Sequence, residues 1–276
     1  MNDVQKLYIA GMGMITPVGA NTAMTAAAVK AGMSAYAVSG FYGQNEEPIT
    51  MASVPSGVFS RIDAEIEKGT LFDARHDRVI KMAIVAIREA CTQRETVKPA
   101  RLTLAMPAEQ CDIEGLVPLV RTLVTNCKPW VSAALSHNIY SGRAAGIEAI
   151  DYAFRNSPAW ADDFMLIGGS DSYRDYSRLS PLTKAQRLLT TSSSDGFAPG
   201  EAAGFLLLTR FPELAQSRNG HIIALHPPGI ADEPGHLSSE EPYRGDGLDA
   251  AFKQALANQP LSSIHSIYSS MNGENH

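Results

Sequence analysis

The sequence predicts a mixed α/β fold, and two observations support that prediction. Short apolar runs of strand length alternate along the chain with helical patterns, as expected of a sheet layered with helices. The chain has 276 residues, of which 45% are hydrophobic and 19% are charged, so it can bury a substantial core. That length suffices for one large α/β unit or for two modest domains.

The elements are predicted in order from these patterns. Strands are expected at residues 7–15, 101–107, 130–135, 163–171, in the last part of 195–210, and at 221–225. Residues 34–72 have no strong period and are predicted to be irregular. Helices are expected to start near Thr22, a candidate N-cap, near Asp77, after residue 107, and near residue 143. A last helix is expected at 247–257, and its inward side chains are expected to be Leu248, Ala251, Phe252, Ala255 and Leu256.

Charge and cysteine content exclude several classes of protein. The formal net charge of −6 and a pI of 5.6 argue against a nucleic-acid partner. The three cysteines have no metal-ligand spacing and are interpreted as free thiols of a reducing compartment. No apolar run approaches the roughly 20 residues of a membrane span. We therefore expect a cytoplasmic protein.

Three stretches, in order, resemble motifs of one enzyme family. The first is YIAGMGMITPVG at residues 8–19, and the second is HDRVIKMAIVAIREA at 76–90. The third runs from 165 to 209 and contains LIGGSDS and then DGFAPGEAAGFLLLT. These are similar to the first strand, the Asp-Arg helix and the glycine-rich strands of the β-ketoacyl synthase branch of the thiolase-fold superfamily. The likeness covers nearly all of residues 7–210 and, less securely, 220–276.

The resemblance implies a thiolase fold, layered α-β-α-β-α, with related halves. Residues 1–210 would form the N-terminal half. Residues 211–276 would start a C-terminal half that is shortened or incomplete, either naturally or because the sequence is a fragment. Family members pair through the strand before the nucleophile helix, which corresponds to residues 130–135 here. A homodimer, or a heterodimer with a thiolase-fold relative, is therefore expected.

The family nucleophile is a cysteine at the start of a helix, where the helix dipole lowers the thiol pKa. Aligning on Ser141-Gly142 places Ile139 at that position, and isoleucine has no nucleophilic atom. Ser141 and His137 could form a substitute pair if they lie in hydrogen-bond reach. The commoner role of a serine at a helix start is N-capping.

The family also uses two polar groups, usually histidines, to stabilise an oxyanion. The run IYSSMNGEN at 267–275 resembles the strand that precedes the first of them, with Asn272 in the place of histidine. Asparagine can donate a hydrogen bond but cannot act as an acid or base, although His276 could compensate. The second histidine would follow residue 276.

The remaining motifs are assigned structural roles. Glu201 is expected to satisfy backbone donors, and Gly196, Gly200 and Gly204 are expected at tight turns and close backbone approaches. The Gly11-Met12-Gly13 run lacks the third glycine of a dinucleotide-binding fingerprint. The acidic residues after 231 match no calcium loop. Neither a cofactor nor a metal is therefore expected.

Two functions remain open. The first is a pseudoenzyme, a non-condensing accessory protein that pairs with a catalytic relative and resembles thiolase-like proteins of bacterial secretion clusters. The second is an acyltransferase of the 3-oxoacyl synthase type, in fatty acid or polyketide biosynthesis. It would act on acyl-carrier-protein or coenzyme A thioesters by an altered mechanism, with Ser141, Asn272, His276 and His137 as its candidate residues.

Overall fold

The computed structural model describes residues 5–63, 74–92, 99–108, 113–157, 164–193, 195–236, 239–257, 259–270, 272 and 274. Its strands are β1 (Leu7–Ile15), β2 (Tyr36–Tyr42), β3 (Pro48–Ala52), β4 (Ala100–Ala105), β5 (Val131–Ile139), β6 (Phe164–Ser172), β7 (Glu201–Thr209), β8 (Ser217–Arg218), β9 (His221–Ile222) and β10 (Ala224–Leu225). Its α-helices are α1 (Thr22–Lys30), α2 (Ser60–Asp63), α3 (Ala74–Thr92), α4 (Ile113–Asn126), α5 (Ala145–Asn156), α6 (Tyr176–Lys184) and α7 (Asp246–Leu256).

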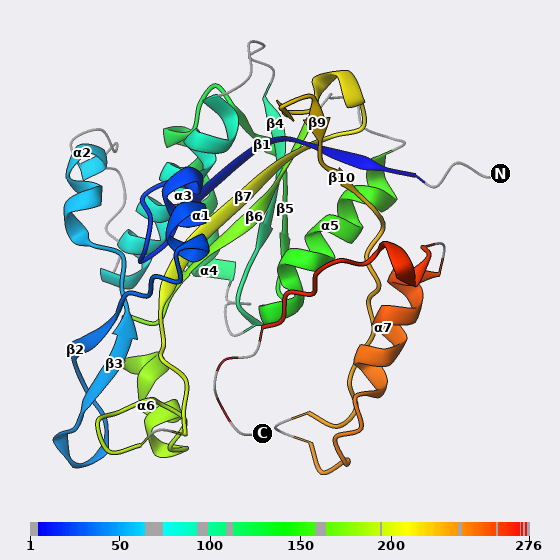
Figure 1. Cartoon of the computed structure of the whole chain (residues 1–276). Coiled ribbons are helices and arrows are strands. Elements are labelled where there is room, and N and C mark those ends of the chain that lie inside the picture. The colour runs from blue at the N-terminus through cyan, green and yellow to red at the C-terminus, as the bar shows by residue number, and fades with distance from the viewer. Residues whose placement is uncertain are drawn as a thin grey trace.

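One mixed sheet organises the described part of the chain, with strand order β10-β1-β7-β6-β4-β5 (Figure 1). β4 runs parallel to both β5 and β6, whereas β7 is antiparallel to its two neighbours, β6 and β1. β1, β4, β5 and β6 therefore point the same way, and β7 alone is reversed among these five strands. Because β5 pairs only with β4, it is an edge strand in the described residues, and it includes most of the strand predicted at 130–135.

Helices cover both faces of this sheet (Figure 1). On one face, α3 and α4 pack against Leu102 and Leu104 of β4 and Leu166 of β6. On the other face, α5 packs against Met165 and Ile167 of β6. Alternate residues of β6 thus enter two different cores, as expected of a strand that is buried on both faces. The result is a three-layered α/β/α unit.

α3 lies very close to β1. An added Cβ on Gly11 would lie 2.1 Å from the carbonyl oxygen of Ala90, and one on Gly13 would lie 1.8 Å from that of Ala86. Since only glycine lacks this atom, both residues are required for the helix to approach the strand. The Gly11-Met12-Gly13 motif therefore packs a helix against a strand.

Three local predictions were wrong. Residues 34–72, expected to be irregular, include the antiparallel hairpin β2–β3, in which Tyr36 pairs with Ala52 and Val38 with Thr50. The N-cap of α1 is Asn21 rather than Thr22, because the Asn21 side chain accepts a hydrogen bond from the backbone N–H of Met24.

The helix predicted at 247–257 is present as α7, but two of the five side chains expected to face inward are exposed. Leu248 is 58% exposed and Phe252 is 44% exposed. The helix instead packs through small residues: a Cβ on Gly229 would lie 1.9 Å from the carbonyl oxygen of Ala251, and Gly247 approaches the backbone of Asp232 in the same way. Ala251 therefore lies at a close contact, whereas Leu248 and Phe252 are exposed.

The segment after residue 220 extends the first sheet, because Leu225 of β10 pairs with Leu7 of β1. Elsewhere in the described residues, the only other sheets are the two-stranded ribbons β2–β3 and β8–β9. The boundary at residue 210 remains a prediction. No helix in the described ranges has the length and apolar character needed to cross a membrane.

Candidate functional site

The parallel strands β4, β5 and β6 end at one edge of the sheet, where open α/β sheets usually bind their ligands. The junction between β5 and α5 lies there. Ile139 is the last residue of β5, and its carbonyl oxygen accepts a hydrogen bond from the N–H of Met106, at 2.8 Å. Its side chain packs against the apolar cluster that includes Ala149 of α5 and Met165 of β6. The family's nucleophile position, as aligned, thus holds a hydrocarbon group in van der Waals contact with a core.

Ser141 follows Ile139 and precedes a short 3-10 helix at Gly142–Ala144. Its hydroxyl is exposed and donates to Oε2 of Glu148, at 2.5 Å, and makes no side-chain cap on that helix. Ser141 therefore occupies the N-cap position of the 3-10 helix, but the expected capping hydrogen bond of its side chain is absent. Glu148 lies one helical turn into α5 and draws the hydroxyl away from the backbone N–H groups that it would otherwise cap.

His137 is exposed on β5, and its ring stacks on Tyr152 of α5, with centroids 4.4 Å apart and planes 10° apart. Within the described residues no hydrogen bond joins His137 to Ser141, because the serine hydroxyl is directed to Glu148. The two residues lie on one strand-to-helix junction but do not form a nucleophile–base pair.

Asn272 lies elsewhere. Its amide donates to Oε2 of Glu274, at 2.6 Å, and both Oε atoms of Glu274 accept from Arg187, at 2.6 and 2.9 Å. Arg187 belongs to the loop after α6, so the contacts of Asn272 are directed there and not to Ser141. The predicted strand at the start of 267–275 is absent, since residues 264–270 have no regular structure and Tyr268 is almost fully exposed. His276 lies outside the described residues.

Two of the three cysteines are described, and both are buried free thiols. Cys127 follows α4 and Cys91 is near the end of α3, so both belong to the core between these helices and the sheet. Burial raises the pKa of Cys127 to about 12, which keeps it a neutral thiol at physiological pH. Cys111 lies outside the described residues.

Two of the resembling motifs meet at a buried ion pair. Glu201 is the first residue of β7 and belongs to the glycine-rich motif; its fully buried side chain pairs with Arg78 of the α3 motif. It also accepts hydrogen bonds from the backbone N–H of Val54, at 2.9 Å, and from the hydroxyl of Ser172, at 2.8 Å. Glu201 therefore satisfies a backbone donor, as predicted, and joins four segments of the chain.

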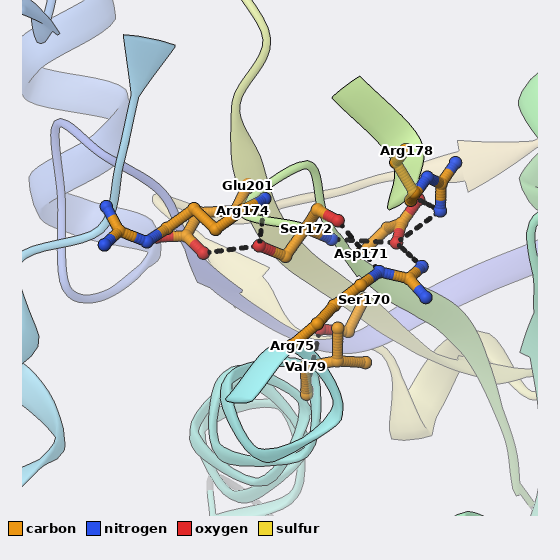
Figure 2. Close-up of polar contacts among 8 residues, drawn as sticks. All are labelled: Arg75, Val79, Ser170, Asp171, Ser172, Arg174, Arg178 and Glu201. Atoms are coloured by element: carbon orange, nitrogen blue, oxygen red, sulfur yellow. Dashed lines mark hydrogen bonds and ion pairs between the residues drawn. The ribbon is translucent and has the colours of Figure 1, made fainter. Parts of the chain in front are cut away.

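Asp171, near the end of β6, forms two further ion pairs close to Glu201 (Figure 2). Asp171 accepts from Arg75, at 2.6 Å, and from Arg178 of α6, at 3.1 Å. Ser170 donates to the carbonyl oxygen of Val79, at 2.8 Å, and fixes β6 to α3. Arg75 and Asp171 were not predicted from the sequence, although an acidic residue that directly follows Gly168-Gly169-Ser170 on an apolar strand was a usable signal.

The predicted close approaches hold for two of the three glycines. A Cβ on Gly196 would lie 2.8 Å from the backbone of Leu188, and one on Gly200 would lie 3.1 Å from that of Ala52. Gly204 has open space around it, so close packing does not explain it.

Between the β2–β3 hairpin and the loop before β7 lies a polar groove of about 370 Å³. The hydroxyls of Ser192 and Thr190 donate to Glu47 there and lower the pKa of that carboxyl. In the described residues no group of three or more His, Cys, Asp or Glu side chains could hold a metal ion.

No protein-family model matches the chain. A curated protein of Schizosaccharomyces pombe, named as a mitochondrial 3-oxoacyl-acyl-carrier-protein synthase, is 31% identical over 149 residues. The match includes 49% of this chain but only 34% of that protein, so the chain spans about a third of its curated relative.

Solved ketosynthases have the same fold. The ishigamide ketosynthase/chain length factor matches with a TM-score of 0.67 and 21% identity, over 92% of this chain and 70% of its own. A type II polyketide synthase complex of an acyl-carrier protein with its ketosynthase matches with a TM-score of 0.62 and 16% identity, over 92% and 70%. The ketosynthase from module 6 of the bacillaene synthase of Bacillus subtilis matches with a TM-score of 0.62 and 16% identity, over 91% and 48%. The chain therefore has the thiolase fold of these solved ketosynthases.

Proposed function

We propose that this chain is a non-condensing, ketosynthase-like accessory protein that pairs with a catalytic thiolase-fold relative. The observation that carries the proposal is Ile139 at the junction of β5 and α5, where its side chain packs into a core. Condensation needs a nucleophile at such a helix start, activated by a neighbouring base or by a lowered pKa. The buried, neutral thiol of Cys127 does not meet that need.

The pairing is proposed for the free edge of β5. An unpaired strand edge exposes backbone N–H and C=O groups that another strand can bind. One structural relative is named a ketosynthase/chain length factor, which supports a pair made of two thiolase-fold chains. The free thiols Cys91 and Cys127 favour a reducing compartment, and we place the pair in the cytoplasm.

The alternative is an acyltransferase that uses Ser141, and one contact favours it. The hydroxyl of Ser141 donates to the carboxylate of Glu148, the arrangement in which a base could accept its proton. The exposure of the serine argues against this alternative, because an activated nucleophile is usually shielded from water.

Incubation with radiolabelled acyl and malonyl thioesters distinguishes the two functions. The accessory protein should yield neither a stable acyl-enzyme nor carbon dioxide. Turnover that is abolished in Ser141→Ala and Glu148→Gln, and kept in the exposed-site control Ser217→Ala, would establish the acyltransferase and overturn the proposal.

The pairing is tested separately by co-expression with a thiolase-fold relative from the same source. Ser132→Lys places a charge on the edge strand and should abolish co-purification, whereas Ser217→Lys on β8 should not. Retention of the relative by Ser132→Lys would show that β5 is not the pairing edge.

A further inference from the structure

A second surface, distant in sequence from β5, exposes large apolar side chains. Six residues of α1, β2 and the turn between them are each more than half exposed; we call them the α1–β2 surface: Met24, Val29, Met33, Tyr36, Val38 and Tyr42. Single exposed hydrophobic residues are ordinary, but Tyr36, Val38 and Tyr42 share one face of a single strand, and such a group of large apolar side chains usually marks an interaction site. Methionine and tyrosine are also enriched where proteins bind one another.

This stretch contains almost no charge. Lys30 is the one charged residue in positions 22–43, whereas 22 residues at the chain's 19% would contain about four. Water-exposed surfaces normally hold many interspersed charges, which keep proteins soluble. A surface without them is suited to contact with another neutral, apolar surface.

The side chains of β2 define an outer face of the hairpin. Tyr36, Val38 and Tyr42 pair with Ala52, Thr50 and Pro48 and share one face, whereas Ile49 and Met51 are buried on the other. An antiparallel ribbon with one solvated face usually has polar residues there. The outer face of this hairpin is instead mainly apolar, with Thr50 among its residues.

The outer edge of β2 is also uncovered. The far edge of β3 is occupied, because the N–H of Thr50 donates to Leu189 and that of Ala52 donates to Pro199, both at 2.9 Å. Within the described residues β2 pairs with β3 alone. The register shift between Val38 and Tyr42 limits regular pairing on this edge to the first half of the strand.

We propose that the α1–β2 surface binds a second copy of this chain, with the two β2 strands pairing antiparallel across a two-fold axis at Ala37. In that register Tyr36 of each copy lies opposite Val38 of the other, an aromatic–β-branched pair that stabilises antiparallel strands. A two-fold contact sets the same patch against itself, so an uncharged patch meets no like-charge repulsion.

The exposure of β2 leaves room for a second copy. Five of the seven residues of β2 are exposed. A standard protein–protein interface uses about 20–30 residues a side, so the strand would form the centre of the contact and residues outside it would complete the interface. This contact uses a different strand edge from the β5 pairing proposed above and does not depend on it.

Sedimentation velocity over a range of protein concentrations tests the proposal. Val38→Lys places a charge on the contact and should raise the dissociation constant for self-association at least tenfold. Ile223→Lys changes an equally exposed hydrophobic residue elsewhere and should leave it unchanged. Far-ultraviolet circular dichroism of each variant establishes that it is folded. Ser132→Lys on β5 should leave the dissociation constant unchanged if the copies associate through β2, and should raise it if they associate through β5.

Cross-linking tests the register. In a Cys111→Ser background, Ala37→Cys should form a disulfide-linked dimer under mild oxidation, and Ser217→Cys on β8 should not. A wild-type chain that stays monomeric, an unchanged mass for Val38→Lys, or dimer formation only in the Ser217→Cys control would each overturn the proposal.

Discussion

The buried carboxylate of Glu201 forms hydrogen bonds and an ion pair with residues from distant parts of the chain. Arg78 is 123 positions away, and Val54 is 147 positions away. Both donate to Glu201, and the hydroxyl of Ser172 completes the set. A buried carboxylate is tolerated only when it is paired and hydrogen-bonded, which explains why so many donors converge on it.

Replacing Glu201 with alanine should therefore leave the guanidinium of Arg78 buried without its partner. We expect a loss of about 3–5 kcal/mol in the free energy of unfolding, measured by urea titration. Asp249→Asn, which breaks the exposed pair with Lys253, is the control and should have almost no effect. Equal effects of the two variants would show that the buried network is not structural.

The thiol of Cys127 should make stability depend on alkaline pH. An unfolded cysteine ionises above about pH 8.5, whereas burial holds the pKa of Cys127 at about 12. Unfolding then releases a proton between these values, so stability that is complete below pH 8.5 falls as pH rises through the window. One such group contributes about 1.4 kcal/mol per pH unit.

Urea unfolding of the wild type and of Cys127→Ala at pH 8, 9 and 10 measures that slope. The free energy of unfolding of Cys127→Ala should fall less steeply with pH than that of the wild type. The cavity left by the substitution lowers stability by the same amount at every pH and does not change this slope. Parallel slopes would mean that the folded thiol ionises normally, and the case against Cys127 as a nucleophile would weaken.

The role of a residue could be predicted from the sequence where its own motif indicates its hydrogen-bond partners. A glutamate in a glycine-rich motif before a strand was expected to satisfy backbone donors, and Glu201 does so. Ser141 was expected to cap a helix, but its competitor is Glu148, seven positions on. Sequence spacing alone does not reveal which acceptor a hydroxyl prefers.

At the scale of elements, the contact of α3 with β1 fixes the sheet to its largest covering helix. The approach depends on two glycines, and a Cβ on Gly13 would overlap the backbone of Ala86. The helix backbone cannot move locally without disturbing the core on its other face.

Gly13→Ala should thus destabilise the protein by at least the roughly 1–3 kcal/mol of an overpacked core, or prevent folding. Gly204→Ala on β7 is the matched control, because a Cβ there meets nothing within 4 Å. Thermal unfolding followed by circular dichroism compares the two. A stable Gly13→Ala protein would contradict the close approach.

The elements that the sequence predicted well are those with strong apolar periods. Residues 7–15 were expected as the first strand and form β1 with these bounds. The β2–β3 hairpin was missed because β2 is apolar on its exposed face, which removes the alternation that identifies a strand. The inward face of α7 was misjudged because the helix packs through glycine and alanine.

At the scale of the whole molecule, residues near position 274 contact the loop that follows α6. The carboxylate of Glu274 is bound by Arg187, 87 positions earlier, and Arg187 also lies over the ring of Phe197. The segment before this contact, residues 264–270, has no regular structure and is exposed. The Arg187–Glu274 ion pair therefore anchors this exposed segment, residues 264–270, which we call the C-terminal strap.

Glu274→Gln should release that strap. Limited proteolysis with chymotrypsin should cleave after Tyr268 several-fold faster than in the wild type, because the tether no longer restrains the segment. Glu213→Gln, at an exposed site, should be cleaved at the wild-type rate. Equal rates in all three proteins would show that the tether does not restrain the strap.

The overall fold could be predicted because three motifs in order resemble one family. The long-range contacts could not. No local pattern links residue 274 to residue 187, or turns α7 so that Leu248 is exposed. Such contacts depend on packing among elements that are far apart in sequence, which neither periodicity nor composition encodes.

The position of β7 in the sheet has a consequence for biosynthesis. β7 lies between β1 and β6, yet its residues 201–209 are synthesised long after residues 7–15 of β1. Until then β1 has no neighbour on that side, and the nascent polypeptide carries two open, apolar strand edges. Such edges are sites of aggregation, so chaperone protection should matter most before translation passes residue 209.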